Sequence, residues 1–96
     1  MKPEDLLDKW KQHIPREGAR CEEATEVMRH LGMEVTQRKT GHWTGKHAAL
    51  VNSALFPFGI ITVNCHAFGK QGVAHPAAIK DIVRAARIIH GEEENE

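Results

Sequence analysis

The sequence predicts an α+β domain in which helices cover one face of a three-stranded antiparallel sheet. Three observations support this prediction: apolar residues recur at helical spacing in some segments, they alternate with polar residues in others, and glycine or proline separates the two kinds. The chain has 96 residues, 41% of them hydrophobic, which suits one domain with one core.

The first two expected helices have clear ends. A helix is expected over residues 1–15, where apolar residues follow Pro3 at helical spacing until Pro15 stops the run. It stands outside the main pattern as an extra N-terminal helix. A second helix is expected over residues 19–31, with Gly32 placed for a left-handed C-cap.

The segments with a period of two predict strands, and a last helix follows them. An antiparallel meander with one exposed face fits their order. The strands are expected over residues 33–38, 42–48 and 60–65. The last helix begins at His75-Pro76, carries an apolar stripe, and stops at Gly91.

Alternation along the strands assigns their side chains to two faces. The face covered by helices is expected to hold Met33, Val35, Trp43, Ile61, Val63 and Cys65. The open face is expected to hold Thr36, Arg38, His42, Thr44, Lys46, Thr62 and Asn64. The second set is polar, partly cationic, and includes an imidazole that can titrate.

Charge is segregated along a chain whose net charge is zero. Residues 1–34 hold six basic and eight acidic groups, residues 35–90 hold seven basic groups against Asp81 alone, and residues 92–96 form an acidic tail with four glutamates. A local cationic surplus favours a polyanionic partner, although an ordinary solvated surface explains the same charges.

The composition also indicates where the protein works. The apolar stretch from Ala54 to Val63 is too short for a membrane helix, so no membrane partner is expected. The N-terminus lacks a secretory signal, and Cys21 and Cys65 make no dense disulfide framework. Cys21, on an apolar stripe, is interpreted as core packing. These features favour a protein of a reducing compartment, the cytoplasm.

Residues 19–90 combine the expected order of elements with the segment Arg38-Lys39-Thr40-Gly41-His42-Trp43. In both features they resemble the HicA toxins, a family of small bacterial mRNA interferases. The resemblance implies a fold similar to double-stranded-RNA-binding domains, RNA as substrate, and a HicB-like antitoxin that covers the active face. It also implies that His42, which follows a glycine-containing turn at the start of the second strand, is catalytic.

Imidazole chemistry agrees with that role. Cleavage of RNA through its 2′-OH needs a base for the hydroxyl and an acid for the leaving 5′-oxygen, and imidazole can serve as either near neutral pH. Arg38 and Lys46, expected on the same face as His42, are candidates for phosphate contact. No cofactor is expected.

A second set of cations lies on the last helix. Lys80, Arg84 and Arg87 recur at one-turn spacing opposite the apolar stripe, where they could follow a phosphate backbone or form an ordinary solvated face. Trp43 could stack on a base, but its expected place on the covered face favours core packing.

Two other functions stay open. A catalytically silent module could hold RNA or a protein through the same sheet. A histidine-based metal-binding regulator is the third possibility, although neither a Cys-x-x-Cys nor a His-Glu-x-x-His motif is present. Its possible zinc ligands are His42, His47, Cys65, His66 and His75.

Overall fold

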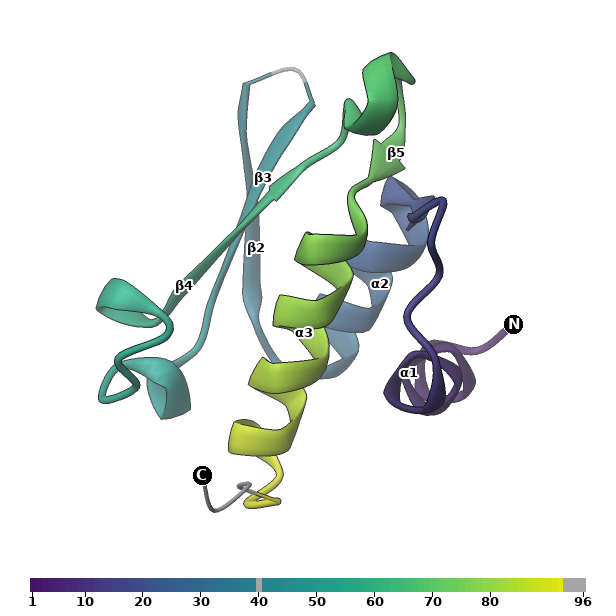
Figure 1. Cartoon of the computed structure of the whole chain (residues 1–96). Helices are drawn as coiled ribbons and strands as arrows, with labels where there is room; N and C mark the ends of the chain where they lie inside the picture. The colour runs from purple at the N-terminus through teal and green to yellow at the C-terminus, as the bar shows by residue number, and fades with distance from the viewer. Residues whose placement is uncertain (40, 93–96) are drawn as a thin grey trace.

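Over residues 1–39 and 41–92, which the computed structural model describes, three α-helices accompany a three-stranded antiparallel sheet and a two-stranded one (Figure 1). The expected α+β class is confirmed, as is the order helix, three strands, helix. The elements are α1 (Pro3–Gln12), β1 (Ala19–Arg20), α2 (Cys21–His30), β2 (Glu34–Lys39), β3 (His42–Lys46), β4 (Ile60–Asn64), β5 (Val73–Ala74) and α3 (Pro76–Ile89).

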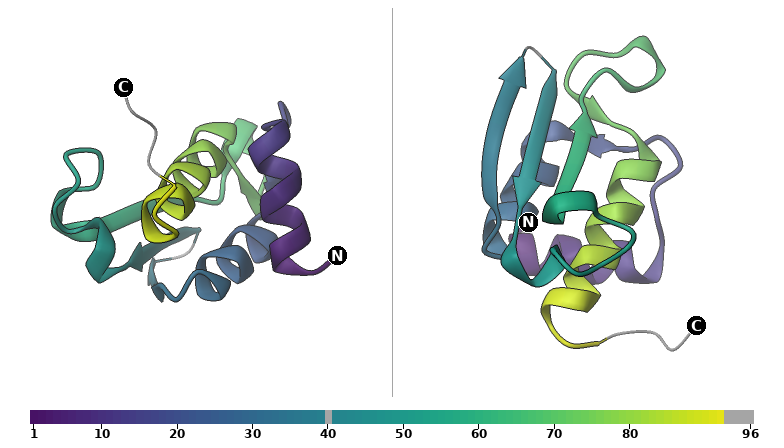
Figure 2. Two further views of the ribbon diagram at one scale, coloured as in Figure 1. Left: turned by 90° about the horizontal axis from the view of Figure 1, so that it is seen from below. Right: turned by 90° about the vertical axis from the view of Figure 1, so that its left-hand side faces the viewer.

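The elements form layers. Figure 2 shows the three-stranded sheet on one side, with α2 and α3 behind it and the other sheet face open. The extra helix α1 packs on α2 and α3 (Figure 1). Apolar side chains fill the space between sheet and helices because burial removes their surface from water. The largest fully buried side chains are Met28, Leu50, Ile61, Ile79, Ile82, Val27 and Val63.

The strand register confirms the expected division into faces. The sheet order is β2-β3-β4, and the register places Thr36, Thr44 and Thr62 side by side. His42 is opposite Asn64 on this open face, while Trp43 is opposite Val63 on the face that the helices cover. A shift of one residue would exchange the two faces, so the buried apolar set keeps this register in place.

Gly32 ends α2 as expected. Its φ of +83° lies in the left-handed region. The backbone N–H of Gly32 donates to the carbonyl of Arg29 at 2.9 Å, and that of Met33 donates to the carbonyl of Met28 at 3.1 Å. This pair of hydrogen bonds is the Schellman pattern, which satisfies carbonyls at the helix end.

Two short strands are not predicted by the sequence pattern. Ala19 and Arg20, expected as the first turn of a helix, pair instead with Ala74 and Val73. The helix α2 therefore begins at Cys21, and α1 ends at Gln12 rather than near residue 15. Strands of two residues carry too few positions for an alternating pattern, so periodicity cannot reveal them.

The cysteines require a correction. Cys21 is buried, as expected, but its sulfur is bonded to that of Cys65 across a sequence separation of 44 residues, with the Cα atoms 5.7 Å apart. A lone pair of cysteines makes no framework pattern, and only the fold brings them together. The disulfide does not support the expectation of a reducing compartment, because such bonds persist mainly under oxidising conditions.

The connection between β3 and β4 projects beyond the sheet (Figure 1). Buried Leu50 and Phe56 anchor it to the core. Val51, Leu55 and Phe58 are exposed by 50%, 57% and 79%. These three side chains form an exposed hydrophobic group beside the sheet. We call the segment that carries them the apolar loop.

Among the helices described, none is long and apolar enough to cross a membrane.

Candidate nucleic-acid interface

His42 begins β3 and is half-buried on the open face. The register places Asn64 of β4 on one side of it and Lys39 of β2 on the other. The pairing of β2 with β3 shifts between Gln37 and Lys39, so Arg38 is the extra residue of a bulge. A bulge places two residues opposite one, and here it brings two exposed cations to the strand beside His42.

The other predicted phosphate ligand on the sheet is farther away. Lys46 lies at the opposite end of β3, four residues from His42, or about 13 Å at the usual rise of a strand. The register partner of Lys46 in β2 is Glu34, so a carboxylate neighbours this lysine. The positive charge of the open face therefore belongs mainly to its His42 end.

A second imidazole reaches this end from the segment after β4. The ring centroids of His42 and His66 are 6.4 Å apart, with an angle of 52° between the ring planes. The backbone N–H of His66 donates to the side-chain oxygen of Asn64 at 2.9 Å. We call Lys39, His42, Asn64 and His66 the His42 site.

Gly41 allows the two histidines to approach. Its φ of +77° lies in the left-handed region that favours glycine. A Cβ atom at this position would collide with the ring of His66. The carbonyl of Gly41 also accepts the backbone N–H of Cys65 at 2.7 Å, which holds the turn against the end of β4.

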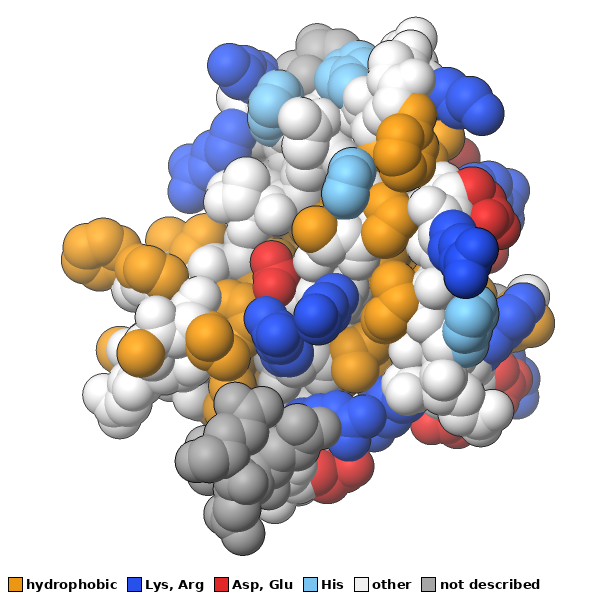
Figure 3. Space-filling view, in the orientation of Figure 1, with side chains coloured by type: hydrophobic (Ala, Val, Ile, Leu, Met, Phe, Trp, Pro, Cys, Tyr) orange, Lys and Arg blue, Asp and Glu red, His pale blue; other side chains and the backbone are white. Residues whose placement is uncertain are grey.

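The cations of α3 lie elsewhere. Lys80, Arg84 and Arg87 line a shallow hollow of about 250 Å³ together with Lys11 and His13 at the end of α1. This hollow is on the helix side of the sheet, whereas the His42 site is on its open face. Figure 3 shows basic side chains gathered over α3 and histidines near the end of the molecule where β4 leaves the sheet. The fold thus separates the two predicted cationic sets.

One acidic group lies beside the α3 cations. The Asp81 carboxylate is 4.0 Å from the Arg84 guanidinium. Partial burial raises the pKa of Asp81 above its ordinary value of 3.8, and the charges of Arg84 and Lys80 oppose that rise.

The acidic tail reaches the same region at its start. The carboxylate of Glu92 lies 3.4 Å from the Lys11 ammonium and 3.6 Å from the His90 ring. The carboxylate of Glu92 therefore pairs with Lys11 at the edge of the hollow. Residues 93–96, the rest of the predicted tail, lie outside the described residues, as does Thr40 of the β2–β3 turn.

Trp43 packs as expected. It is half-buried against the core, and the Arg29 guanidinium lies 5.9 Å from its ring centroid. A cation over an aromatic face is a favourable contact that occupies the ring. Base stacking on Trp43 therefore gains no support from its position.

The possible zinc ligands have other roles. The Nδ1 atoms of His47 and His75 accept the backbone N–H groups of Ala49 and Ala77 at 3.0 and 2.9 Å. Cys65, bonded in the disulfide, is not a thiolate, the form that binds zinc. Within the described part of the chain, no three histidine, cysteine or acidic side chains gather as a metal site would require.

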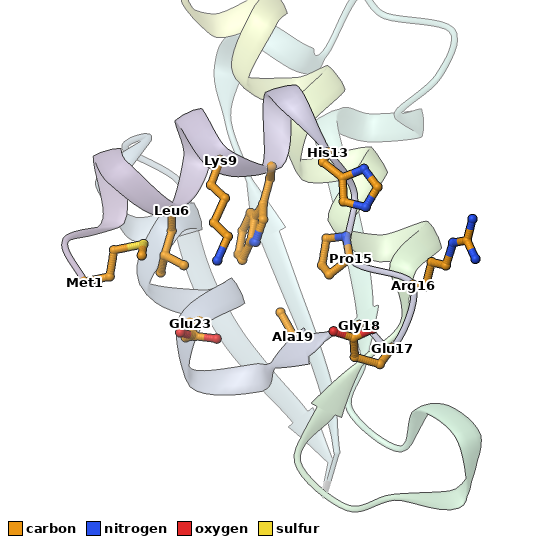
Figure 4. Close-up of a pocket in the computed structure, with 11 residues that line it drawn as sticks. Met1, Leu6, Lys9, His13, Pro15, Arg16, Glu17, Gly18, Ala19 and Glu23 are labelled. Atoms are coloured by element: carbon orange, nitrogen blue, oxygen red, sulfur yellow. The ribbon is translucent and has the colours of Figure 1, made fainter.

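A larger hollow, of about 400 Å³, lies between α1, the segment after it and the start of α2 (Figure 4). Its lining includes Lys9, His13 and Arg16 as well as Glu17 and Glu23. None of the candidate site residues from the sequence lines it, and its mixed charges favour no single class of ligand.

The sequence does not predict the roles of three residues near the open face. Alternation leaves Lys39 in the turn and gives Glu34 no role, and His66 is expected as a possible metal ligand or as the base that would act in place of His42. The bulge at Arg38 and the turn after β4 bring Lys39 and His66 to His42. A histidine two residues after Asn64, on the alternation of the open face of β4, is the available signal for His66.

Comparison of the chain with protein-family models, with curated proteins and with solved structures gives no match in any of the three.

Proposed function

We propose that this protein is a HicA-like endoribonuclease, an mRNA interferase toxin that cleaves RNA at the His42 site without a metal ion. One observation carries the proposal: an imidazole stands on an open, polar sheet face, with Lys39 in register beside it and none of the described helices over it. The resemblance of residues 19–90 to that toxin family points in the same direction.

The residues of the site suit each part of the reaction. His42 exchanges a proton with the reacting groups, because imidazole can act as acid or base near neutral pH. Lys39 and Arg38 stabilise the negative charge that grows on the phosphate oxygens in the transition state. Lys46 contacts the RNA backbone farther along the strand.

The α3 cations form a second binding surface, separate from the His42 site. Lys80, Arg84 and Arg87 attract a phosphate backbone on the helix side of the molecule. Such contacts raise affinity without reading sequence, because phosphates carry no base information.

The partner proposed for the open face is a HicB-like antitoxin. The apolar loop supports this part of the proposal, since exposed apolar groups rimmed by polar residues mark protein-binding surfaces. An antitoxin seated on Val51, Leu55 and Phe58 would extend over the adjoining sheet face and block access to His42.

The cytoplasmic location also stays a proposal. It requires that Cys21 and Cys65 be largely reduced in the cell, since cytosolic thiols are kept reduced. Alkylation of free thiols during lysis, followed by mass spectrometry, measures this directly. Full protection of both cysteines from alkylation contradicts a cytoplasmic location.

The test is RNA cleavage in the presence of EDTA. The parent protein should cut, and His42→Ala should lower the rate by about 10²–10⁴-fold, the usual contribution of acid–base catalysis. His30→Ala, which removes an exposed imidazole from the end of α2, is the matched control and should cut like the parent.

The alternatives give different results. RNA binding without cleavage by the parent indicates the silent module. Cleavage that EDTA abolishes and zinc restores indicates a metal-dependent function. Unchanged cleavage by His42→Ala, with circular dichroism like that of the parent, removes His42 from the reaction.

A further inference from the structure

We propose that His66 is a second catalytic residue, and that His42 and His66 act as a base–acid pair on one phosphodiester. This inference rests on the proposed function, because it assigns the second proton transfer of that reaction. The sequence alone offers His66 as a substitute for His42 or as a possible zinc ligand, and the described residues do not assemble such a zinc site. Neither expectation has the two histidines act together.

The spacing of the rings suits one phosphate. Each imidazole needs to come within about 2.6–3.2 Å of the oxygen whose proton it moves. The ring centroids of His42 and His66 are 6.4 Å apart, so both rings are near enough to approach different oxygens of one phosphodiester. The ring planes are inclined at 52°, so the rings do not stack on each other. The space between them therefore stays open.

Three contacts place His66 there. Its ring lies against the backbone of Gly41, the residue before His42, at a position where any side chain would collide with it. Its backbone N–H is held by the side chain of Asn64, which is the register partner of His42. The preceding residue, Cys65, is buried, and its backbone N–H donates to the carbonyl of Gly41 at 2.7 Å.

The surroundings leave the pair accessible and cationic. His66 is exposed, and His42 is half-buried on a sheet face that none of the described helices covers. Lys39 lies beside His42 in register. A phosphate seated between the rings would therefore meet a positive charge together with two groups able to carry protons.

The reaction balances with two imidazoles. The neutral ring takes the 2′-OH proton as that oxygen bonds to phosphorus, and the protonated ring gives its proton to the 5′-oxygen as the P–O5′ bond breaks. The products are a 2′,3′-cyclic phosphate and a 5′-hydroxyl. Water then opens the cyclic phosphate while the two rings return the protons in the reverse direction.

The first experiment is a pH–rate profile of RNA cleavage by the full chain. The parent should show a bell-shaped dependence of kcat/KM, since one ring must be neutral and the other protonated. His66→Ala should lower the rate by about 10²–10⁴-fold and remove one limb of the bell. His30→Ala should keep both limbs.

The second experiment replaces the leaving 5′-oxygen by sulfur, because a thiolate departs without receiving a proton. Only one of the variants His42→Ala and His66→Ala should then recover a rate near that of the parent. It is the variant that lacks the acid.

The outcomes separate the two claims. If His66→Ala cleaves at the rate of the parent and keeps the bell-shaped pH dependence, the role of His66 is overturned. His42 then remains as the proposed catalyst. Rescue of both variants, or of neither, also overturns the pair. Absence of cleavage by the parent overturns the proposed function itself, and the pair with it. His66→Asn, scored by circular dichroism beside His66→Ala, distinguishes loss of the imidazole from loss of the fold.

Discussion

The imidazole of His66 occupies the space that a side chain on Gly41 would fill. The β2–β3 turn and the segment after β4 are therefore packed together where β3 begins. This contact connects local backbone conformation to the candidate site, because Gly41 precedes His42 and needs a positive φ of +77°.

Replacement of Gly41 by alanine should destabilise the fold through two separate costs. The left-handed backbone costs an L-residue about 1–2 kcal/mol, and the new Cβ must also displace the ring of His66. In a His66→Ala background only the first cost remains. The free energies of unfolding of the four proteins in urea measure the coupling.

The matched control for this cycle is Gly91→Ala. Gly91 also has a positive φ, +70°, but nothing lies within 4 Å of its Cβ position. Its substitution should cost the same amount in either background. A Gly41→Ala cost that is equal with and without the His66 ring contradicts the packing of the ring against this turn.

The disulfide should contribute strongly to stability. It links residues 44 apart, and the chain-entropy model gives about 4 kcal/mol for closing such a loop in the unfolded state. Dithiothreitol should lower the melting temperature of the parent. The double variant Cys21→Ser, Cys65→Ser should melt at a lower temperature and ignore the reductant; identical melting of parent and double variant would contradict the contribution.

Asp81 should make stability depend on pH in an unusual direction. Its pKa is raised in the folded state, by burial above all, so folding favours the protonated form. The stability that this group contributes is therefore greatest below its ordinary pKa of 3.8 and is lost as the pH rises through the folded value.

Asp81→Asn tests that sign. As the pH rises from below 3.8, the parent should lose stability relative to the variant, measured by urea unfolding at each pH. Glu26→Gln, on the exposed side of α2, is a control for general charge effects. A parent that gains stability over the variant as the pH rises contradicts a raised pKa for Asp81.

Much of this architecture follows from simple patterns. Alternation from Thr36 to Asn64 predicts the open face, and the glycine after Leu31 predicts the end of α2, because both depend on local geometry. The disulfide, the pairing of Ala19 with Ala74, and the approach of His66 to Gly41 depend on segments distant in sequence. A single sequence carries no periodic signal for such contacts.

The candidate site also combines residues that local geometry predicts with residues that depend on strand pairing. His42 is predictable because a turn and a strand place it on the open face. Lys39 is not, because the bulge at Arg38 shifts the register by one residue, which alternation does not reveal. Glu34 becomes the neighbour of Lys46 only once the strand pairing is known.

The α3 cations should bind RNA in a manner that salt weakens. Each phosphate contact contributes about −0.7 to the slope of log affinity against log salt for single strands. Arg84→Glu should therefore make the slope less negative. It should weaken the binding of all RNA sequences by similar factors. Arg16→Glu, an exposed change on the segment after α1, is the control. An unchanged affinity and slope in Arg84→Glu would make the stripe an ordinary solvated surface.

The proposed function depends above all on the 2′-OH of RNA acting as the nucleophile at the His42 site. The most direct measurement compares an RNA oligonucleotide with the same oligonucleotide carrying a single 2′-deoxy residue at the mapped cleavage position, in EDTA. We expect cleavage of the first to a 2′,3′-cyclic phosphate and a 5′-hydroxyl, and no cleavage of the second at that bond. Equal cleavage of both substrates, or products with a 5′-phosphate, would contradict the proposal.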